Sequence, residues 1–174
     1  MHNNQKAVDE ATLRPLLNLI AKAESNSNYD AYFGNAANKS LKLTKMPIKD
    51  VLSWQTDYVN DGSPSSAAGR YQIINTTLAE LTKSIQIDKN QPFDDKTQDQ
   101  LAIALINRRG APAYVNGKLS AIDFAASLAK EWAALPKTTG VDPDKSYYAS
   151  DGLNQSRISV DEILTVVKKV KAKE

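Results

Sequence analysis

The sequence predicts an α+β fold in which helices dominate and one small β-hairpin accompanies them. Apolar residues recur at helical spacing in roughly six segments of the chain. Residues 29–43 differ, because aromatic residues lead, Gly34-Asn35 offers turn chemistry and a Ser-Leu-Lys-Leu run alternates. With 174 residues, of which 41% are hydrophobic and 24% charged, the chain suits one globular domain spanning 1–174.

The first predicted helix has its apolar residues at positions i, i+3, i+4, i+7 and i+8, namely Leu13, Leu16, Leu17, Ile20 and Ala21. Pro15 suits only a first helical turn, so we expect the helix to start near it. An Asn- and Ser-rich run ends this helix after Ser25.

Five more helices are expected, over about 47–59, 75–85, 95–109, 120–135 and from 159 into a lysine-rich tail. Their expected caps are Asn75 or Thr76, Asp94 or Asp95, Ser120 and Ser159, with Gly110 closing the third of them. Residues 60–72 and 137–157 are expected to be loops, and residues 1–10 and 172–174 to be frayed.

The residue inventory excludes several kinds of chemistry. The chain has no cysteine, and its one histidine is His2 at the terminus. A disulfide framework, a cysteine nucleophile and a Ser-His-Asp triad are therefore excluded, and no metal site built on His or Cys is expected. Acid–base catalysis would fall mainly to Asp and Glu, with Lys or Tyr as substitutes.

Charge and hydropathy argue against two classes of partner. The formal net charge is only +2, so a nucleic-acid partner is not expected. We interpret the lysine-rich tail as a solvated helix end, where the positive charges suit the helix dipole. No apolar run approaches the roughly 20 residues of a membrane span. The N-terminus carries acids within its first dozen residues and does not resemble a secretory signal.

Glu24 is the first candidate for a catalytic group. It lies four residues after Ile20 and eleven after Leu13, so it continues the apolar stripe of the first helix. Burial and the carbonyl groups at a helix C-terminus both disfavour a charged carboxylate and raise its pKa, which suits a general acid. A glutamate that simply faces solvent at the helix end is the alternative.

Two further segments carry side chains suited to a sugar polymer. Small residues at 65–69 lead into Arg70, Tyr71 and Gln72, which offer hydrogen-bond donors, an aromatic face and an amide. A simple connecting loop is the alternative for this segment. Tyr147 and Tyr148 lie in the late loop and are better ligand candidates than Trp132, which is expected in the core.

Taken in order along the chain, these segments resemble a known family. They are Ala-Glu-Ser at 23–25, 29–35, Ser-Ala-Ala-Gly-Arg-Tyr-Gln-Ile at 66–73, 107–119, 131–136 and 146–152. The set is similar to the phage lambda lysozyme-like family of phage muramidases, which are lytic transglycosylases of bacterial peptidoglycan. The resemblance covers roughly residues 13–168.

This resemblance implies a lysozyme-like fold with a helical lobe and a small β-hairpin lobe flanking a glycan cleft. Glu24 would act as acid and then base, cleaving the β-1,4 bond between N-acetylmuramic acid and N-acetylglucosamine and leaving a 1,6-anhydro ring. Ser25 would hydrogen-bond near the acid, Gln72 and the Tyr71 backbone would bind sugar groups, and Tyr148 with Tyr147 would stack on a sugar face. No cofactor and no metal are implied.

Two alternatives stay open. A hydrolytic lysozyme needs a second carboxylate, about 5 Å from the first when it retains configuration and about 6.5–9.5 Å when it inverts. Asp30, Asp57 and Asp61 are the candidates for that carboxylate. The other alternative is a non-catalytic glycan-binding module on the same fold.

The expected partner is the glycan strand of bacterial peptidoglycan, acted on by a monomer without membrane insertion. Without a secretory signal, the protein would stay in the host cytoplasm until its release to the periplasm and cell wall, or would be part of the virion.

Overall fold

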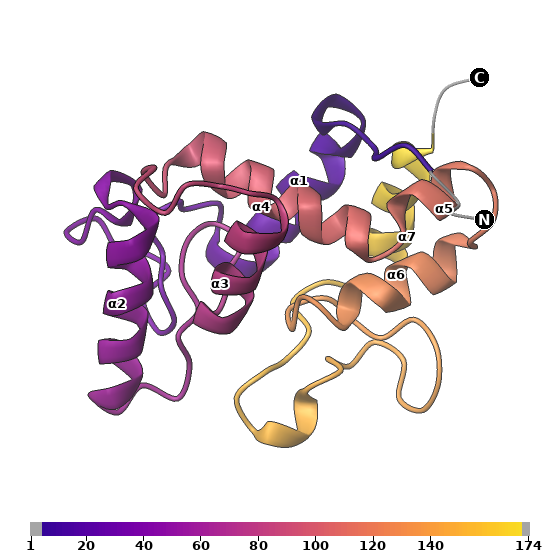
Figure 1. Ribbon diagram of the computed structural model, residues 1–174. Helices are drawn as coiled ribbons and strands as arrows, with labels where there is room; N and C mark the ends of the chain where they lie inside the picture. The colour runs from indigo at the N-terminus through magenta and orange to yellow at the C-terminus, as the bar shows by residue number, and fades with distance from the viewer. Residues whose placement is uncertain (1–4, 172–174) are drawn as a thin grey trace. The chain divides into compact units, whose positions relative to one another are not determined.

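The computed structural model describes residues 5–171, so expectations for His2 and for the ends at 1–4 and 172–174 lie outside the described residues. Within this range the chain forms seven α-helices, two short 3-10 helices and no β-strand (Figure 1). The helices are α1 (Glu10–Ser25), α2 (Ile48–Asn60), α3 (Asn75–Ser84), α4 (Asp95–Arg108), α5 (Ala111–Val115), α6 (Ala121–Ala129) and α7 (Val160–Val170). The 3-10 helices are η1 (Leu43–Lys45) and η2 (Ala149–Asp151).

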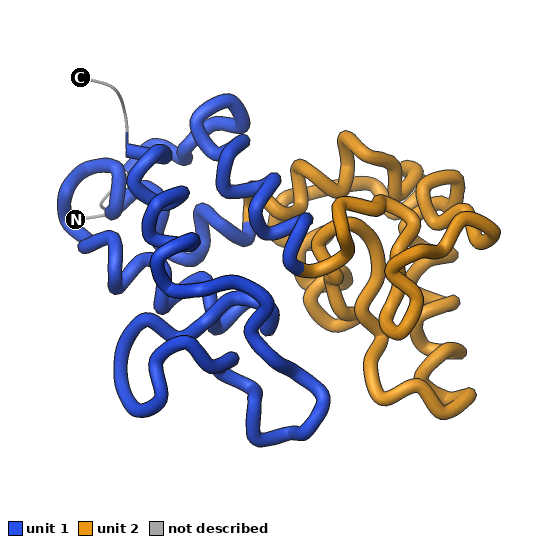
Figure 2. Tube along the Cα trace, turned by 180° about the vertical axis from the view of Figure 1, so that it is seen from behind, with its two compact units in different colours: residues 1–23, 105–174 blue, residues 24–104 orange. Residues whose placement is uncertain are grey.

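The chain divides into two compact units, coloured separately in Figure 2. One unit consists of the described residues up to Ala23 and of those from Leu105 onward, and the other runs from Glu24 to Ala104. The boundaries fall within α1 and within α4, so each of these helices contributes residues to both units.

The apolar stripe of α1 is confirmed, because all five of its residues are fully buried. The expected start near Pro15 is wrong, since the helix begins at Glu10 with Pro15 inside it. Asp9 caps this earlier start: its Oδ1 accepts the N–H of Thr12 at 2.9 Å. Hydrogen bonding to Thr12 also lowers the pKa of the Asp9 carboxyl.

The predicted β-hairpin at 29–43 is wrong, and with it the β-hairpin lobe and the α+β class. This segment makes only isolated bridges, in which Tyr32 pairs with Asn35 and with Ala68. The buried Asn38 takes the place of a strand ladder, because its Nδ2 donates to the carbonyls of Asp30 (2.6 Å) and Leu41 (2.7 Å). Asn side chains that bond nearby backbone in this way compete with regular structure.

The unit from Glu24 to Ala104 is built on α2, α3 and the first part of α4. The two former helices pack together, and the buried side chains include Ile48 and Val51 of α2 and Leu78 and Leu81 of α3. The expected cap at Asn75 or Thr76 is wrong, since Ile74 occupies the N-cap position and makes no side-chain cap bond.

The C-terminal part of the other unit contains α5, α6 and α7. The short α5 was not predicted, and Gly110 with φ +112° forms its N-cap directly after α4. The caps at Ser120 and Ser159 are confirmed, the latter as a full capping box. The expected end of α6 near 135 is wrong, because the helix stops at Ala129 and the chain reaches Pro136 through turns.

In this unit, α5 packs against both α6 and α7 through Tyr114. The Tyr114 ring stacks on Phe124 with ring centroids 5.0 Å apart, and its hydroxyl donates to the Val167 carbonyl at 2.9 Å. Trp132 is buried, as expected for a core residue. Glu131 pairs with Arg109 at 2.6 Å, which fastens the residues after α6 to the end of α4.

Candidate functional site

Glu24 is the penultimate residue of α1 and is partly exposed, although the stripe that leads to it is fully buried. The next residue, Ser25, is fully buried, and its hydroxyl donates to the Arg70 carbonyl at 2.7 Å. This bond joins the end of α1 to the loop at 66–73. The carboxyl group is thus carried on a fixed backbone and is still reachable by a ligand.

The loop at 66–73 is a tight turn with a defined shape. Ala68 and Ile73 exchange backbone hydrogen bonds of 3.1 and 2.9 Å. Gln72 has a positive φ of 48°, and its Nε2 donates to the Gly69 carbonyl at 2.9 Å. The Gly69 N–H in turn donates to the Ala31 carbonyl at 2.7 Å.

Two buried glutamine side chains, from α2 and α4, form hydrogen bonds with the backbone of this loop. Gln55 of α2 donates from Nε2 to the carbonyls of Ser66 (2.7 Å) and Ile73 (2.9 Å), at the two ends of the loop. Gln98 of α4 accepts the Arg70 N–H at 2.8 Å through Oε1. The loop geometry therefore depends on α2 and α4 as well as on its own turn residues.

The Tyr71 side chain is buried. It is 1% exposed, and its hydroxyl donates to Asp99 Oδ1 at 2.6 Å. The Tyr29 hydroxyl donates to the same oxygen at 2.9 Å. The Arg70 guanidinium lies 4.8 Å from the centroid of the Tyr29 ring. Burial raises the pKa of the Tyr71 hydroxyl far above its ordinary value, and the bond to Asp99 raises it further.

Sequence reasoning missed Gln98 and Asp99. Gln98 precedes the buried Leu101 and Leu105 by three and seven residues, so it lies on the apolar stripe of α4. The same face argument that singled out Glu24 would have found it. The contact between Asp99 and two tyrosines from distant segments had no comparable sequence signal.

The three candidates for a second carboxylate differ in their surroundings. Asp30 is partly buried, and its Oδ1 accepts the N–H of Thr44 in η1 at 2.8 Å. Asp57 lies exposed on α2, and Asp61 is exposed directly after that helix. Asp30 is therefore held in a structural contact, whereas the other two face solvent.

Tyr147 and Tyr148 lie in the unit that contains α6 and α7, and both are exposed, at 48% and 41%. Their ring centroids are 6.0 Å apart. The Tyr148 hydroxyl donates to the Lys130 carbonyl at 2.6 Å, and the Lys130 Nζ lies 5.7 Å from the centroid of the Tyr147 ring. The two aromatic faces are therefore presented at the end of α6.

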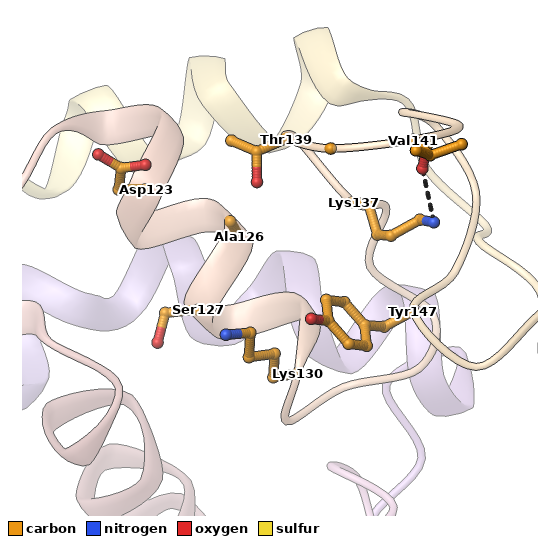
Figure 3. Close-up of a pocket in the computed structure, with 9 residues that line it drawn as sticks. Asp123, Ala126, Ser127, Lys130, Lys137, Thr139, Val141 and Tyr147 are labelled. Atoms are coloured by element: carbon orange, nitrogen blue, oxygen red, sulfur yellow. Dashed lines mark hydrogen bonds between the residues drawn. The ribbon is translucent and has the colours of Figure 1, made fainter.

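A pocket of about 530 Å³ opens beside Tyr147, between α6 and the loop that follows it (Figure 3). It is lined by Asp123, Ala126, Ser127, Lys130, Lys137, Thr139, Gly140, Val141 and Tyr147. All of these residues belong to one compact unit.

Comparison with known proteins decides the family. A family model described as Endolysin matches residues 15–158, which include Glu24, the loop at 66–73 and both exposed tyrosines. The chain belongs to the endolysin family. Membership implies an enzyme that degrades peptidoglycan during lysis of the bacterial cell wall. No curated protein and no solved structure gives a significant match.

The match identifies the endolysin family as a whole and not one branch of it. Among residues 5–171 of this endolysin, no helix is both long enough and apolar enough to cross a membrane. In the same range, no cluster of three or more histidine, aspartate or glutamate side chains is arranged to hold a metal ion.

Proposed function

We propose that this member of the endolysin family cleaves the β-1,4 bond between N-acetylmuramic acid and N-acetylglucosamine as a lytic transglycosylase. The observation that carries the proposal is the bond from the Ser25 hydroxyl to the Arg70 carbonyl. It joins the helix end that bears a partly exposed Glu24 to a loop that bears Gln72. An acid and an amide group suited to an N-acetyl sugar are thus carried on two segments that are directly bonded to each other.

Glu24 acts twice in the proposed reaction. It first gives its proton to the glycosidic oxygen as the bond to C1 of muramic acid breaks. The resulting carboxylate then takes the proton of the C6 hydroxyl of the same sugar, whose oxygen attacks C1 and closes the 1,6-anhydro ring. No water is consumed, and Glu24 ends protonated as it began.

The surroundings of Asp30 favour this one-carboxylate route over hydrolysis. A retaining or inverting hydrolase needs a second carboxylate that serves as nucleophile or base. Asp30, the candidate nearest to Glu24 in sequence, already accepts the Thr44 N–H. Hydrolysis would then depend on Asp57 or Asp61, which face solvent on and after α2.

The other candidate residues supply the proposed sugar contacts. Gln72 and the Tyr71 backbone bind N-acetyl or hydroxyl groups, while Ser25 holds the helix end that carries the acid. Tyr147 and Tyr148 stack on a sugar face, for which their exposed rings are suited. The protein acts as a monomer on glycan strands, without a cofactor, either after release to the wall or from the virion.

Product analysis and one substitution test this proposal together. Purified peptidoglycan digested by the protein should yield muropeptides with 1,6-anhydromuramic ends, identified by mass spectrometry. Glu24→Gln should lower the rate of their release about 10²–10⁴-fold, because the amide cannot transfer the proton. Folding, followed by thermal unfolding, should be retained.

Glu10→Gln is the matched control, because it makes the same change on the same helix at an exposed position. It should leave the rate near that of the wild type. Products that are only hydrated and reducing would exclude the transglycosylase. Clearing at a near-normal rate by Glu24→Gln would exclude Glu24 as the acid, and binding without any cleavage by the wild type would indicate a glycan-binding module.

A further inference from the structure

The pocket beside Tyr147 has one regular wall. Asp123, Ala126, Ser127 and Lys130 are spaced at i, i+3, i+4 and i+7, so they lie on one face of α6 and its C-cap (Figure 3). The facing wall comes from residues 137–141 and Tyr147.

The loop that forms the second wall is tied down at several points. The Lys137 N–H donates to the Lys145 carbonyl at 2.8 Å, and the Lys137 carbonyl accepts the Asp144 N–H at 3.1 Å. The Thr138 hydroxyl donates to the Ile122 carbonyl of α6 at 2.7 Å. These bonds hold the loop against the helix, so the pocket is formed before any ligand binds.

The charges in the pocket favour an anion. The lining contains two ammonium groups, those of Lys130 and Lys137, and one carboxylate, that of Asp123. This carboxylate accepts the Ser120 hydroxyl at 2.8 Å at the helix N-terminus. Lys137 donates to the Val141 carbonyl at 2.7 Å, and an ammonium group has two further N–H donors.

The remaining lining groups add polar and apolar contacts. Ser127 and Thr139 offer hydroxyl groups, while Ala126, Val141 and the Tyr147 ring offer apolar surface. A volume of about 530 Å³ falls within the roughly 300–1,000 Å³ typical of small-ligand sites. The pocket therefore suits a short anionic group that also carries methyl or methylene groups.

We propose that this pocket binds the peptide stem of peptidoglycan through its carboxylates, which rests on the proposed function. The N-acetylated sugars of the glycan strand are neutral, whereas the stem peptides carry carboxylates and small apolar side chains. Each stem branches from a muramic acid. Tyr147 lines the pocket and is also proposed to stack on a sugar, so a stem could enter the pocket from a strand that lies on this ring.

Binding of a sugar-free stem peptide tests the assignment without requiring cleavage. The probe is the tetrapeptide L-Ala–γ-D-Glu–meso-diaminopimelate–D-Ala, titrated into the full chain by calorimetry. We expect binding that weakens with added salt. Amidation of the peptide carboxyl groups should weaken it as well.

The double variant Lys130→Gln/Lys137→Gln should bind the peptide on the order of tenfold more weakly, because two charge-assisted contacts are lost. A glutamine at 137 can still donate to the Val141 carbonyl, so the loop contact is not removed outright. Lys130→Glu, which leaves Lys137 untouched, should weaken binding at least as much. The control Lys118→Gln/Lys169→Gln makes the same change in net charge at exposed positions outside the pocket and should bind like the wild type.

Three outcomes would overturn the proposal. They are a wild type that does not bind the peptide at millimolar concentration, pocket variants that bind as tightly as the control, and inorganic phosphate that displaces the peptide at equal concentration, which would indicate a simple anion site. Because cleavage is assayed separately, anhydro products without peptide binding would refute the pocket alone. Peptide binding without anhydro products would refute the transglycosylase alone.

Discussion

Gly69 has no room for a side chain. Its φ is +82°, and an added Cβ would lie 2.4 Å from Gln98 Oε1 and 2.9 Å from the Phe93 ring. Both the backbone conformation and the close approach therefore require glycine at this point of the 66–73 loop.

Gly69→Ala should lower the free energy of unfolding by about 2–4 kcal/mol, since left-handed strain and the clash act together. Gly34→Ala is the control, because Gly34 has the same φ of +82° but its Cβ would meet only Tyr58 Oη at an ordinary 3.8 Å. Gly34→Ala should lower the free energy of unfolding by about 1 kcal/mol, because it introduces the left-handed strain without the clash. Urea unfolding measures both, and equal losses would contradict the role given to Gln98 and Phe93.

At the scale of single residues, sequence position predicted well where a helix was involved. The stripe that led to Glu24 is buried as expected, and Ser25 closes the helix as expected. The roles of Glu24, Ser25, Tyr71, Gln72, Tyr147 and Tyr148 in catalysis or binding stay predictions. The burial of the Tyr71 side chain against Asp99 was not foreseen, because that contact joins residues 28 positions apart.

At the scale of elements, Gln98 of α4 connects the loop at 66–73 to two other segments of the chain. Besides accepting the Arg70 N–H, its Nε2 donates to the carbonyls of Tyr29 (3.0 Å) and Phe93 (2.9 Å). One fully buried amide thus serves three backbone groups from three segments.

Gln98→Met keeps the size of the side chain but removes these hydrogen bonds. We expect a loss of about 2–4 kcal/mol in the free energy of unfolding, because buried backbone groups lose their partners. Peptidoglycan cleavage should fall as well if the loop positions the sugar. Gln100→Met on the same helix is exposed and should stay within about 0.5 kcal/mol of the wild type. Similar stability for the two variants would refute the supporting role.

The segment at 29–43 shows why element type was harder to predict than helix position. Its aromatics and turn residues are typical of a hairpin, but Tyr29 and Tyr32 point to different partners: Asp99 in one case, and Trp54 with ring centroids 5.3 Å apart in the other. Asn38 satisfies the backbone locally. Long-range contacts of this kind override local β propensity.

At the scale of the whole molecule, three tyrosines with raised pKa values make the free energy of unfolding depend on pH in the alkaline range. Burial raises the pKa of Tyr29, Tyr71 and Tyr114, and Asp99 raises it further for the first two. In the unfolded chain tyrosine ionises near pH 10, so above this pH the unfolded state has lost protons that the folded state keeps. The contribution of these tyrosines to the free energy of unfolding is fully present below about pH 10. It is lost as pH rises towards their raised pKa values in the folded state.

We therefore expect the free energy of unfolding to fall as pH rises from about 10, by up to about 1.4 kcal/mol per pH unit for each such tyrosine. Tyr71→Phe should be less stable than the wild type near neutral pH, because the bond to Asp99 is lost, but should show a shallower alkaline slope. Urea unfolding between about pH 9 and 11 measures this. An unchanged slope would mean that the Tyr71 hydroxyl is not held protonated by the fold.

The sequence by itself determined the positions of most helices, the caps at Ser120 and Ser159, the end of α1 at Ser25 and the resemblance that pointed to peptidoglycan. The helices, their caps and the end of α1 depend on residues within a few turns of each other, where helical periodicity and capping chemistry act directly. The resemblance depends instead on the order of several short motifs along the chain. Only the tertiary structure decided that residues 29–43 form no strand, that Gln55 and Gln98 shape the loop at 66–73, and that two lysines line one pocket. Those features arise from contacts between distant segments. Helical periodicity can indicate that a residue such as Gln98 is buried, but it does not indicate which distant group that residue contacts.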